Sequence, residues 1–283
     1  MKNSKKKSPL TIPVYRRLRT KLIASFLVPV ICIILLGVIS YQRASAAIIS
    51  NYENSLQETV TMTNQYLTLV VDTVRSTYKS YLSDTDLSSY LKGIMDEASA
   101  KRLAVEYTKD LKREANTNSL VSNIYIISDD VISLTSGAPT TSTLLTAYTE
   151  STQGTQVDDQ RSSYHLFGSL CDADEALGTN KQNYSLRIAK YISNSKSILL
   201  IDIDRDTIMN SLDSLSAGDG SYAALITHDG TEFYSDGNAT RDSVFSSSDF
   251  YKEVAESEEG GMKYVDYNEQ KYLFLYSPMY SPK

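Results

Sequence analysis

The sequence predicts an α+β protein in which a transmembrane helix continues into a long stalk helix and is followed by two antiparallel-sheet modules. Three observations support this fold class: an uncharged apolar segment over residues 22–42, a helical period over 44–82, and hairpin patterns after residue 116. With 41% hydrophobic residues, the chain can bury a core. Fully disordered and low-complexity classes are therefore excluded.

Charge is unevenly distributed along the chain. The formal net charge is −6, yet residues 1–21 contain eight basic side chains and no acidic one. The remaining residues carry 20 basic against 34 acidic side chains. A nucleic-acid-binding body needs positive charge over its folded surface, so we expect no nucleic-acid partner. The eight basic residues are Lys2, Lys5, Lys6, Lys7, Arg16, Arg17, Arg19 and Lys21.

Residues 22–42 contain no charged side chain and form a nearly continuous apolar run. About 20 helical residues span the roughly 30 Å hydrocarbon core of a bilayer. The positive-inside rule makes residues 1–21 a cytoplasmic tail and places the chain after about residue 43 outside the cell membrane. The alternative is a signal peptide cleaved after the Ala44-Ser45-Ala46 stretch, but the run is longer than the apolar core of a signal peptide, which is usually about 7–15 residues. We expect an uncleaved, single-pass anchor in the lipid bilayer.

The stalk follows directly. Apolar residues recur three or four positions apart over residues 44–82, and neither Pro nor Gly interrupts before Gly93. This pattern predicts one long amphipathic helix. Because such a helix buries only a stripe, it needs a partner helix or a domain along it, and we expect a homodimer through the stalk.

Short helices complete the segment 43–115. Asp84 or Asp86 is the expected N-cap of a helix that reaches Met95. A second helix is expected from about Asp96 to Ala115, where apolar residues stack at i+4.

The predicted membrane-distal module covers residues 116–217. Its expected strands are Asn123–Ser128 with a hairpin partner over 131–136, then a second hairpin of residues 184–192 and 198–204. Between the hairpins, the polar stretch 136–183 is expected to hold a helix near Leu144–Tyr148 and otherwise mixed loop. Asp204 or Asp206 caps a final helix that ends near Leu215.

The predicted membrane-proximal module covers residues 218–283. One hairpin is expected around the turn His228-Asp229-Gly230 and another around Asn268-Glu269-Gln270. Between them, residues 247–259 read as a helix that stops at Gly260-Gly261.

This order of elements resembles the double-Cache sensor domain of bacterial transmembrane receptors, which carries two PAS-like sheets on a stalk helix. The likeness lies in RIAKYI followed by SILLIDIDRDTIMNSL, in GDGSYAALITHDGTEFYSDG, and in a membrane segment similar to that of methyl-accepting chemotaxis receptors. One departure is Ser197, which stands where the family usually has Gly before the apolar strand.

The resemblance also implies a ligand site. The amino-acid-sensing branch grips its ligand with an Arg-x-Trp-Tyr segment and a later Asp. The best matches here are Arg161, Tyr164 and Asp174, with Ser163 in place of the Trp. An Arg pairs a carboxylate bidentately and an Asp pairs an ammonium, whereas the competing interpretation is a solvated polar loop. Weaker candidates on the strands are Tyr125, Tyr184 and Tyr191.

Taken with the anchor, the resemblance implies the small-molecule-sensing region of a signalling receptor, most similar to a chemoreceptor. The ligand class stays open between amino acids, organic acids and amines. Alternatives are the input domain of a sensor histidine kinase or of a diguanylate cyclase, and a membrane-anchored capture protein without an output domain.

The residue inventory predicts no enzyme. The chain has two His and lacks the H-E-x-x-H, phosphate-loop and G-x-S-x-G motifs, so we expect no catalytic residue, cofactor or metal. The series Asp202, Asp204, Asp206 has the spacing of a calcium loop. However, position six is Thr207 instead of Gly and position twelve, Asp213, is not the bidentate Glu.

Overall fold

A computed structural model describes residues 14–192, 195–216, 218 and 220–279. Lys2, Lys5, Lys6 and Lys7 of the predicted basic tail, and the predicted module end at 280–283, lie outside these residues. The chain divides into two compact units, Met1–Ser55 and Leu56–Lys283. Both predicted sheet modules therefore fall in the second unit.

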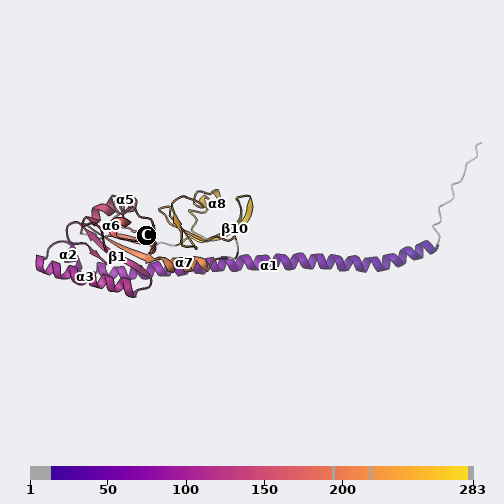
Figure 1. Cartoon of the computed structure of the whole chain (residues 1–283). Helices are drawn as coiled ribbons and strands as arrows, with labels where there is room; N and C mark the ends of the chain where they lie inside the picture. The colour runs from indigo at the N-terminus through magenta and orange to yellow at the C-terminus, as the bar shows by residue number, and fades with distance from the viewer. Residues whose placement is uncertain (1–13, 193–194, 217, 219, 280–283) are drawn as a thin grey trace, which may run out of the picture. The chain divides into compact units, whose positions relative to one another are not determined.

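Helix α1 (Val14–Leu82) contains the apolar segment and its predicted continuation without a break (Figure 1). Pro29 lies inside the helix, where a membrane-spanning segment tolerates it. Among the described residues, one helix is long and apolar enough to cross a membrane, and it is this one. The apolar helix and its extension to Leu82 are confirmed; its orientation stays a prediction.

The second unit is built on a five-stranded antiparallel sheet with the strand order β2-β1-β5-β4-β3. The two long central hairpin strands, β4 and β5, agree with the predicted bounds to within one residue. The strands are β1 (Val121–Ser128), β2 (Leu134–Thr135), β3 (Tyr164–Gly168), β4 (Tyr184–Ile192) and β5 (Ser197–Asp204).

Helices cover both faces of this sheet (Figure 1). On one face, the end of α1, α3 (Glu97–Thr117) and α7 (Arg205–Asp213) pack against every second strand residue in a shared core. The opposite face is covered by three short helices, α4 (Leu144–Thr149), α5 (Thr152–Asp159) and α6 (Asp174–Leu177), over a second core. Because strand side chains alternate between faces, the apolar runs of β1, β4 and β5 are buried on both sides.

Two helices end differently from the prediction. Helix α2 (Thr85–Leu91) begins after the Asp84 cap as expected but stops before Met95, because Gly93 takes a left-handed φ of 64°. Helix α3 begins one residue after the predicted start near Asp96, which is its N-cap, and ends at Thr117, two residues beyond the predicted Ala115.

The stretch 136–183 is more regular than expected. Besides α4 it contains α5, strand β3 and α6. The sequence pattern misses them because each is short, at eight, five and four residues. Strand β3 depends on pairing with β4, with Phe167 opposite Arg187.

The C-terminal region, residues 220–279, holds two small sheets where the prediction has one PAS-like sheet. Strands β6 (Ala224–Ile226), β7 (Glu232–Tyr234) and β8 (Ala239–Thr240) form one sheet. The hairpin of β9 (Gly261–Tyr267) and β10 (Gln270–Tyr276) forms the other.

The prediction of a helix over residues 247–259 is wrong in its length. Helix α8 covers only Asp249–Lys252. Four glutamates follow at Glu253, Glu256, Glu258 and Glu259, and negative charge at a helix C-terminus opposes the helix dipole. The continuation also lacks an apolar stripe to bury.

Candidate functional site

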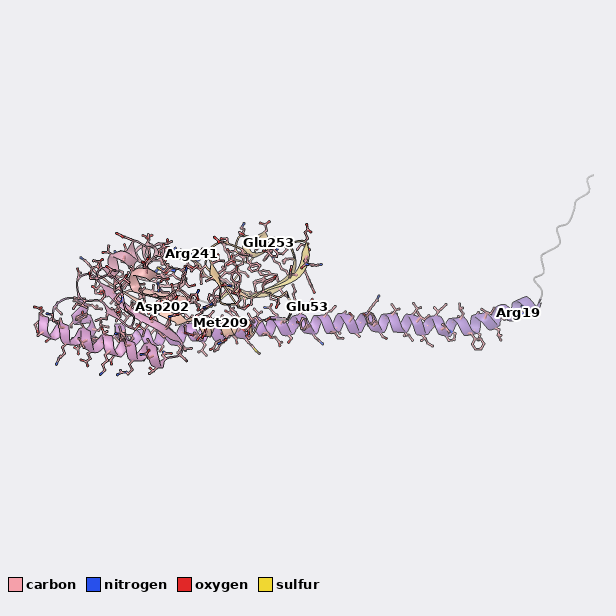
Figure 2. The ribbon with its side chains drawn as sticks, viewed as in Figure 1. Arg19, Glu53, Asp202, Met209, Arg241 and Glu253 are labelled. Carbon is pink, nitrogen blue, oxygen red and sulfur yellow. The ribbon has the colours of Figure 1, made fainter. Side chains whose placement is uncertain are left out.

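A charged cluster lies buried on the sheet face that α4, α5 and α6 cover. Arg187 of β4 and Asp202 of β5 are register partners, and both are fully buried. Arg187 Nε lies 2.6 Å from Asp202 Oδ1, and Nη2 lies 3.1 Å from Oδ2. This two-point geometry is the strongest pairing an Arg and a carboxylate can make. Asp202 is labelled in Figure 2.

A second carboxylate reaches Arg187 from the covering helices. Asp174, the first residue of α6, places Oδ1 2.9 Å from Arg187 Nη1. The Tyr184 hydroxyl donates to both Asp174 oxygens at 3.0 and 2.8 Å, and its ring lies 4.6 Å from the guanidinium. One guanidinium therefore lies between a strand carboxylate and a helix carboxylate, over an aromatic ring.

Electrostatics keep Arg187 charged. Burial alone would lower the pKa of Arg187, but its electrostatic interactions with Asp202, Tyr184 and Asp174 outweigh burial and raise the pKa well above its usual value. Burial raises the pKa of Asp202, and Arg187 opposes that rise. Arg187 thus lies beside two carboxyl groups in a water-poor environment.

Two tyrosines extend this cluster. The Tyr125 hydroxyl lies 2.6 Å from Thr179 Oγ1, and both side chains are buried. The Tyr148 hydroxyl of α4 is fully buried and has no hydrogen-bond partner among the described residues. Buried hydroxyls are rarely left unpaired, because losing water without a partner costs about 1–3 kcal/mol. A polar ligand group could both accept from Tyr148 and compete with Asp174 for Arg187.

The six residues predicted as a ligand site fall into three places. Asp174, Tyr125 and Tyr184 lie together on the buried face just described. Arg161 is exposed, donates from Nε to Asp158 at 2.8 Å, and lies 4.6 Å from the Tyr191 ring.

Tyr164 packs towards the stalk side of the sheet. Its ring lies between Arg75 of α1 at 4.5 Å and Lys190 of β4 at 4.9 Å, and it contacts Tyr78 edge-on. Among the described contacts, none joins Tyr164 or Arg161 to the buried cluster. The ligand-binding role of the six residues stays a prediction.

The ligand site predicted from the sequence does not include three members of the buried cluster, namely Arg187, Asp202 and Tyr148. The available signal was a charged residue at an alternate position of an otherwise apolar strand, in YSLRIAKYI and in ILLIDID. Such a charge needs a partner, since unpaired burial is prohibitively costly.

The calcium-like series is explained by other roles. Asp202 pairs with Arg187, and Asp204 caps α7 by accepting from the Thr207 amide at 3.2 Å. Within the described chain, no group of three or more His, Cys, Asp or Glu side chains is arranged to hold a metal.

Two open grooves lie elsewhere in the second unit. The larger, about 660 Å³, is bordered by Met62 and Tyr66 of α1 and by Asp206 and Asn210 of α7. The smaller, about 390 Å³, lies beside α8 and β9. Neither contains a residue of the buried cluster.

No protein-family model and no curated protein matches the chain.

Proposed function

We propose that the chain is the small-molecule-sensing region of a membrane-anchored signalling receptor of the double-Cache type, most similar to a chemoreceptor. In this proposal residues 1–21 are cytoplasmic, and the second unit lies outside the cell. The ligand binds on the α4–α6 side of the five-stranded sheet, against Arg187, Tyr148 and Asp174.

One observation carries the proposal: the helix that contains the apolar segment also supplies core side chains to the sheet with the buried cluster. Leu67, Val70, Val74 and Tyr78 of α1 are buried in the same core as strand residues of β1, β4 and β5. A change in how these strands pack therefore acts directly on the helix. A ligand shifts this equilibrium only if it binds one packing state better than the other.

A homodimer through the stalk belongs to the same proposal. Met62, Tyr66 and Leu69 are exposed on α1, four and three residues apart. This is the spacing of a two-stranded coiled-coil seam. The test is cysteine crosslinking of Leu69→Cys in membranes, with Asp72→Cys, also exposed on α1, as the matched control. A stalk dimer crosslinks at 69 in preference to 72, and equal crosslinking at both positions would contradict it.

The ligand site is tested by thermal-shift screening of the full chain in lipid nanodiscs against amino acids, organic acids and amines. A ligand of the folded state raises the unfolding midpoint by mass action. For Tyr148→Phe we expect that at least about three times more ligand is needed to give the same rise in the unfolding midpoint. The midpoint without ligand should stay within about 2 °C of wild type, because the hydroxyl has no hydrogen-bond partner to lose.

Arg161→Ala is the matched test of the sequence-based site. Its side chain is exposed, so the unliganded midpoint should not change. If Arg161→Ala abolishes the shift and Tyr148→Phe keeps it, the ligand binds at the predicted loop instead of the buried cluster. If the whole panel gives no shift, the receptor proposal loses its support.

A further inference from the structure

The turn between β6 and β7 inserts a buried carboxylate among the helices that cover the Arg187 cluster. Asp229 lies in this turn, and its side chain is only 2% exposed. Its Oδ2 accepts from Gln153 Nε2 of α5 at 3.1 Å, and its Oδ1 accepts from the backbone N of Gly168 at 3.3 Å, where β3 ends. We call Asp229, Gln153 and Gly168, together with Thr231, the Asp229 latch.

Further hydrogen bonds join the two segments that meet at the latch. Gln153 Nε2 also donates to the Gly168 carbonyl at 3.0 Å, and Gln153 is 1% exposed. Thr231 is fully buried, and its hydroxyl donates to the Ser169 carbonyl at 3.4 Å. A Cβ at Gly168 would lie 2.3 Å from Thr231 Cβ, so glycine is required for this close approach.

Within its own turn, Asp229 is also held firmly. Its Oδ1 accepts from Thr227 Oγ1 at 2.5 Å and from the Thr231 backbone N at 3.4 Å. These bonds fix the carboxylate relative to strands β6 and β7. One carboxylate therefore bonds at the same time to α5, to the end of β3 and to its own turn.

A seven-residue segment leads from the latch to the buried cluster. It begins at Gly168 and ends at Asp174, which holds Arg187. Between them, Leu170 has a left-handed φ of 76°, a conformation that non-glycine residues rarely adopt and that surrounding contacts must maintain. Asp174 and the latch residue Gly168 are thus the two ends of one short, continuous segment.

A parallel link runs through Asp172. Its carboxylate accepts from Thr152 Oγ1 at 2.9 Å, at the start of α5, and lies 3.8 Å from Arg241, which follows β8. Arg241 Nη2 also lies 3.8 Å from Asp229 Oδ2 (Arg241 is labelled in Figure 2). The same guanidinium thus lies between the latch carboxylate and the residue two positions before Asp174.

We infer that the Asp229 latch couples the state of the Arg187 cluster to the C-terminal region, so that displacing Asp174 loosens the β6–β7 turn. The inference rests on the proposed function only for the identity of the ligand that displaces Asp174. The coupling between Asp174 and the β6–β7 turn does not require a ligand. A bistable element biased from one end is the physical requirement for such transmission.

Hydrogen–deuterium exchange of the full chain in lipid nanodiscs tests the latch. In Asp229→Ala we expect exchange to accelerate about tenfold or more both in residues 226–232 and across the latch in α5. The matched control is Asp236→Ala, which removes an exposed turn carboxylate that accepts only from Asn238, at 2.8 and 2.7 Å, among the bonds described. Its effect should stay within residues 234–240.

Two further variants complete the test. Gln153→Ala removes the hydrogen-bond donor that α5 supplies to Asp229 and should accelerate exchange in the 226–232 turn. If Asp229→Ala unfolds the whole unit, Gln153→Ala is the variant that tests the latch. Asp174→Asn should also accelerate exchange in this turn. The inference is overturned if the effects of Asp229→Ala and Gln153→Ala stay on their own side, or if Asp174→Asn leaves the turn unchanged. None of these outcomes depends on whether a ligand is found.

Discussion

The five-stranded sheet and the C-terminal region have similar strand patterns but very different interiors. Long strands of the first are buried on both faces and carry an ion pair inside the core. In the second, β9 alternates between half-buried and exposed side chains, and β10 is half-buried along most of its length. Fully buried side chains are concentrated at Thr231, Glu232 and Phe233 of the segment that contacts the first region.

The difference lies in what covers each sheet. Helices pack on both faces of the five-stranded sheet, whereas aromatic rings such as Phe245, Phe250 and Tyr267 cover the small sheets in edge and tilted contacts. Aromatic side chains bury a large area without complete enclosure. The first region is therefore expected to tolerate loss of a charge partner poorly, and the second to respond more gradually.

The largest effect is expected from Asp202→Ala. The change leaves Arg187 buried with one of its two carboxylates gone, and breaking a buried pair typically costs about 3–5 kcal/mol. Chemical denaturation of the full chain measures the free energy of unfolding. The matched control Asp204→Ala removes only a helix cap and should cost about 1 kcal/mol. Equal losses would mean that Arg187 does not depend on Asp202.

A smaller effect is expected from Glu232→Gln in the C-terminal region. Glu232 is buried and accepts from the backbone N atoms of Phe245 and Ser246 and from the hydroxyls of Ser246 and Tyr234. An amide cannot accept all four bonds, so we expect a loss of about 1.5–3 kcal/mol near neutral pH.

The same variant has a pH signature. Burial by itself would raise the pKa of Glu232, but hydrogen bonds from Ser246, Tyr234 and the backbone outweigh burial and lower the pKa below its usual value. A carboxyl whose pKa is lower in the folded state stabilises the fold above its unfolded pKa and loses that contribution as the pH falls through its folded pKa. The difference in free energy of unfolding between wild type and Glu232→Gln should shrink below about pH 4. A difference that stays constant down to about pH 2 would refute the prediction that Glu232 stabilises the fold as an ionised, hydrogen-bonded carboxylate.

The smallest effect is expected from Leu273→Ala in β10. Leu273 is half-buried, so truncation should cost about 1 kcal/mol, whereas Leu200→Ala in the fully buried β5 should cost about 2–5 kcal/mol. Unfolding midpoints of the two variants measure the difference. If Leu273→Ala costs as much as Leu200→Ala, the C-terminal region is as tightly packed as the first and the contrast between the two fails.

Part of the candidate site could be predicted from the sequence. The sequence predicts Asp174, Tyr125 and Tyr184 as candidates, and the three side chains lie on the sheet side that α4, α5 and α6 cover. Arg161 and Tyr164 are predicted with them because the resemblance implies an Arg-x-x-Tyr segment and a later Asp around one ligand. The direction of strand β3 separates them, since Tyr164 packs against Arg75 of the stalk and Arg161 lies in solvent.

The sequence by itself determined the elements whose signal is local: the apolar helix and its continuation to Leu82, the starts of α2 and α3, and the long strands β4 and β5. Only the tertiary structure decided which groups meet. Arg187 and Asp202 become partners through strand register, Asp174 reaches them from a four-residue helix, and Asp229 reaches Gln153 across 76 positions of sequence. Periodicity reports which face a side chain occupies, whereas the partner on that face depends on register and packing between distant segments.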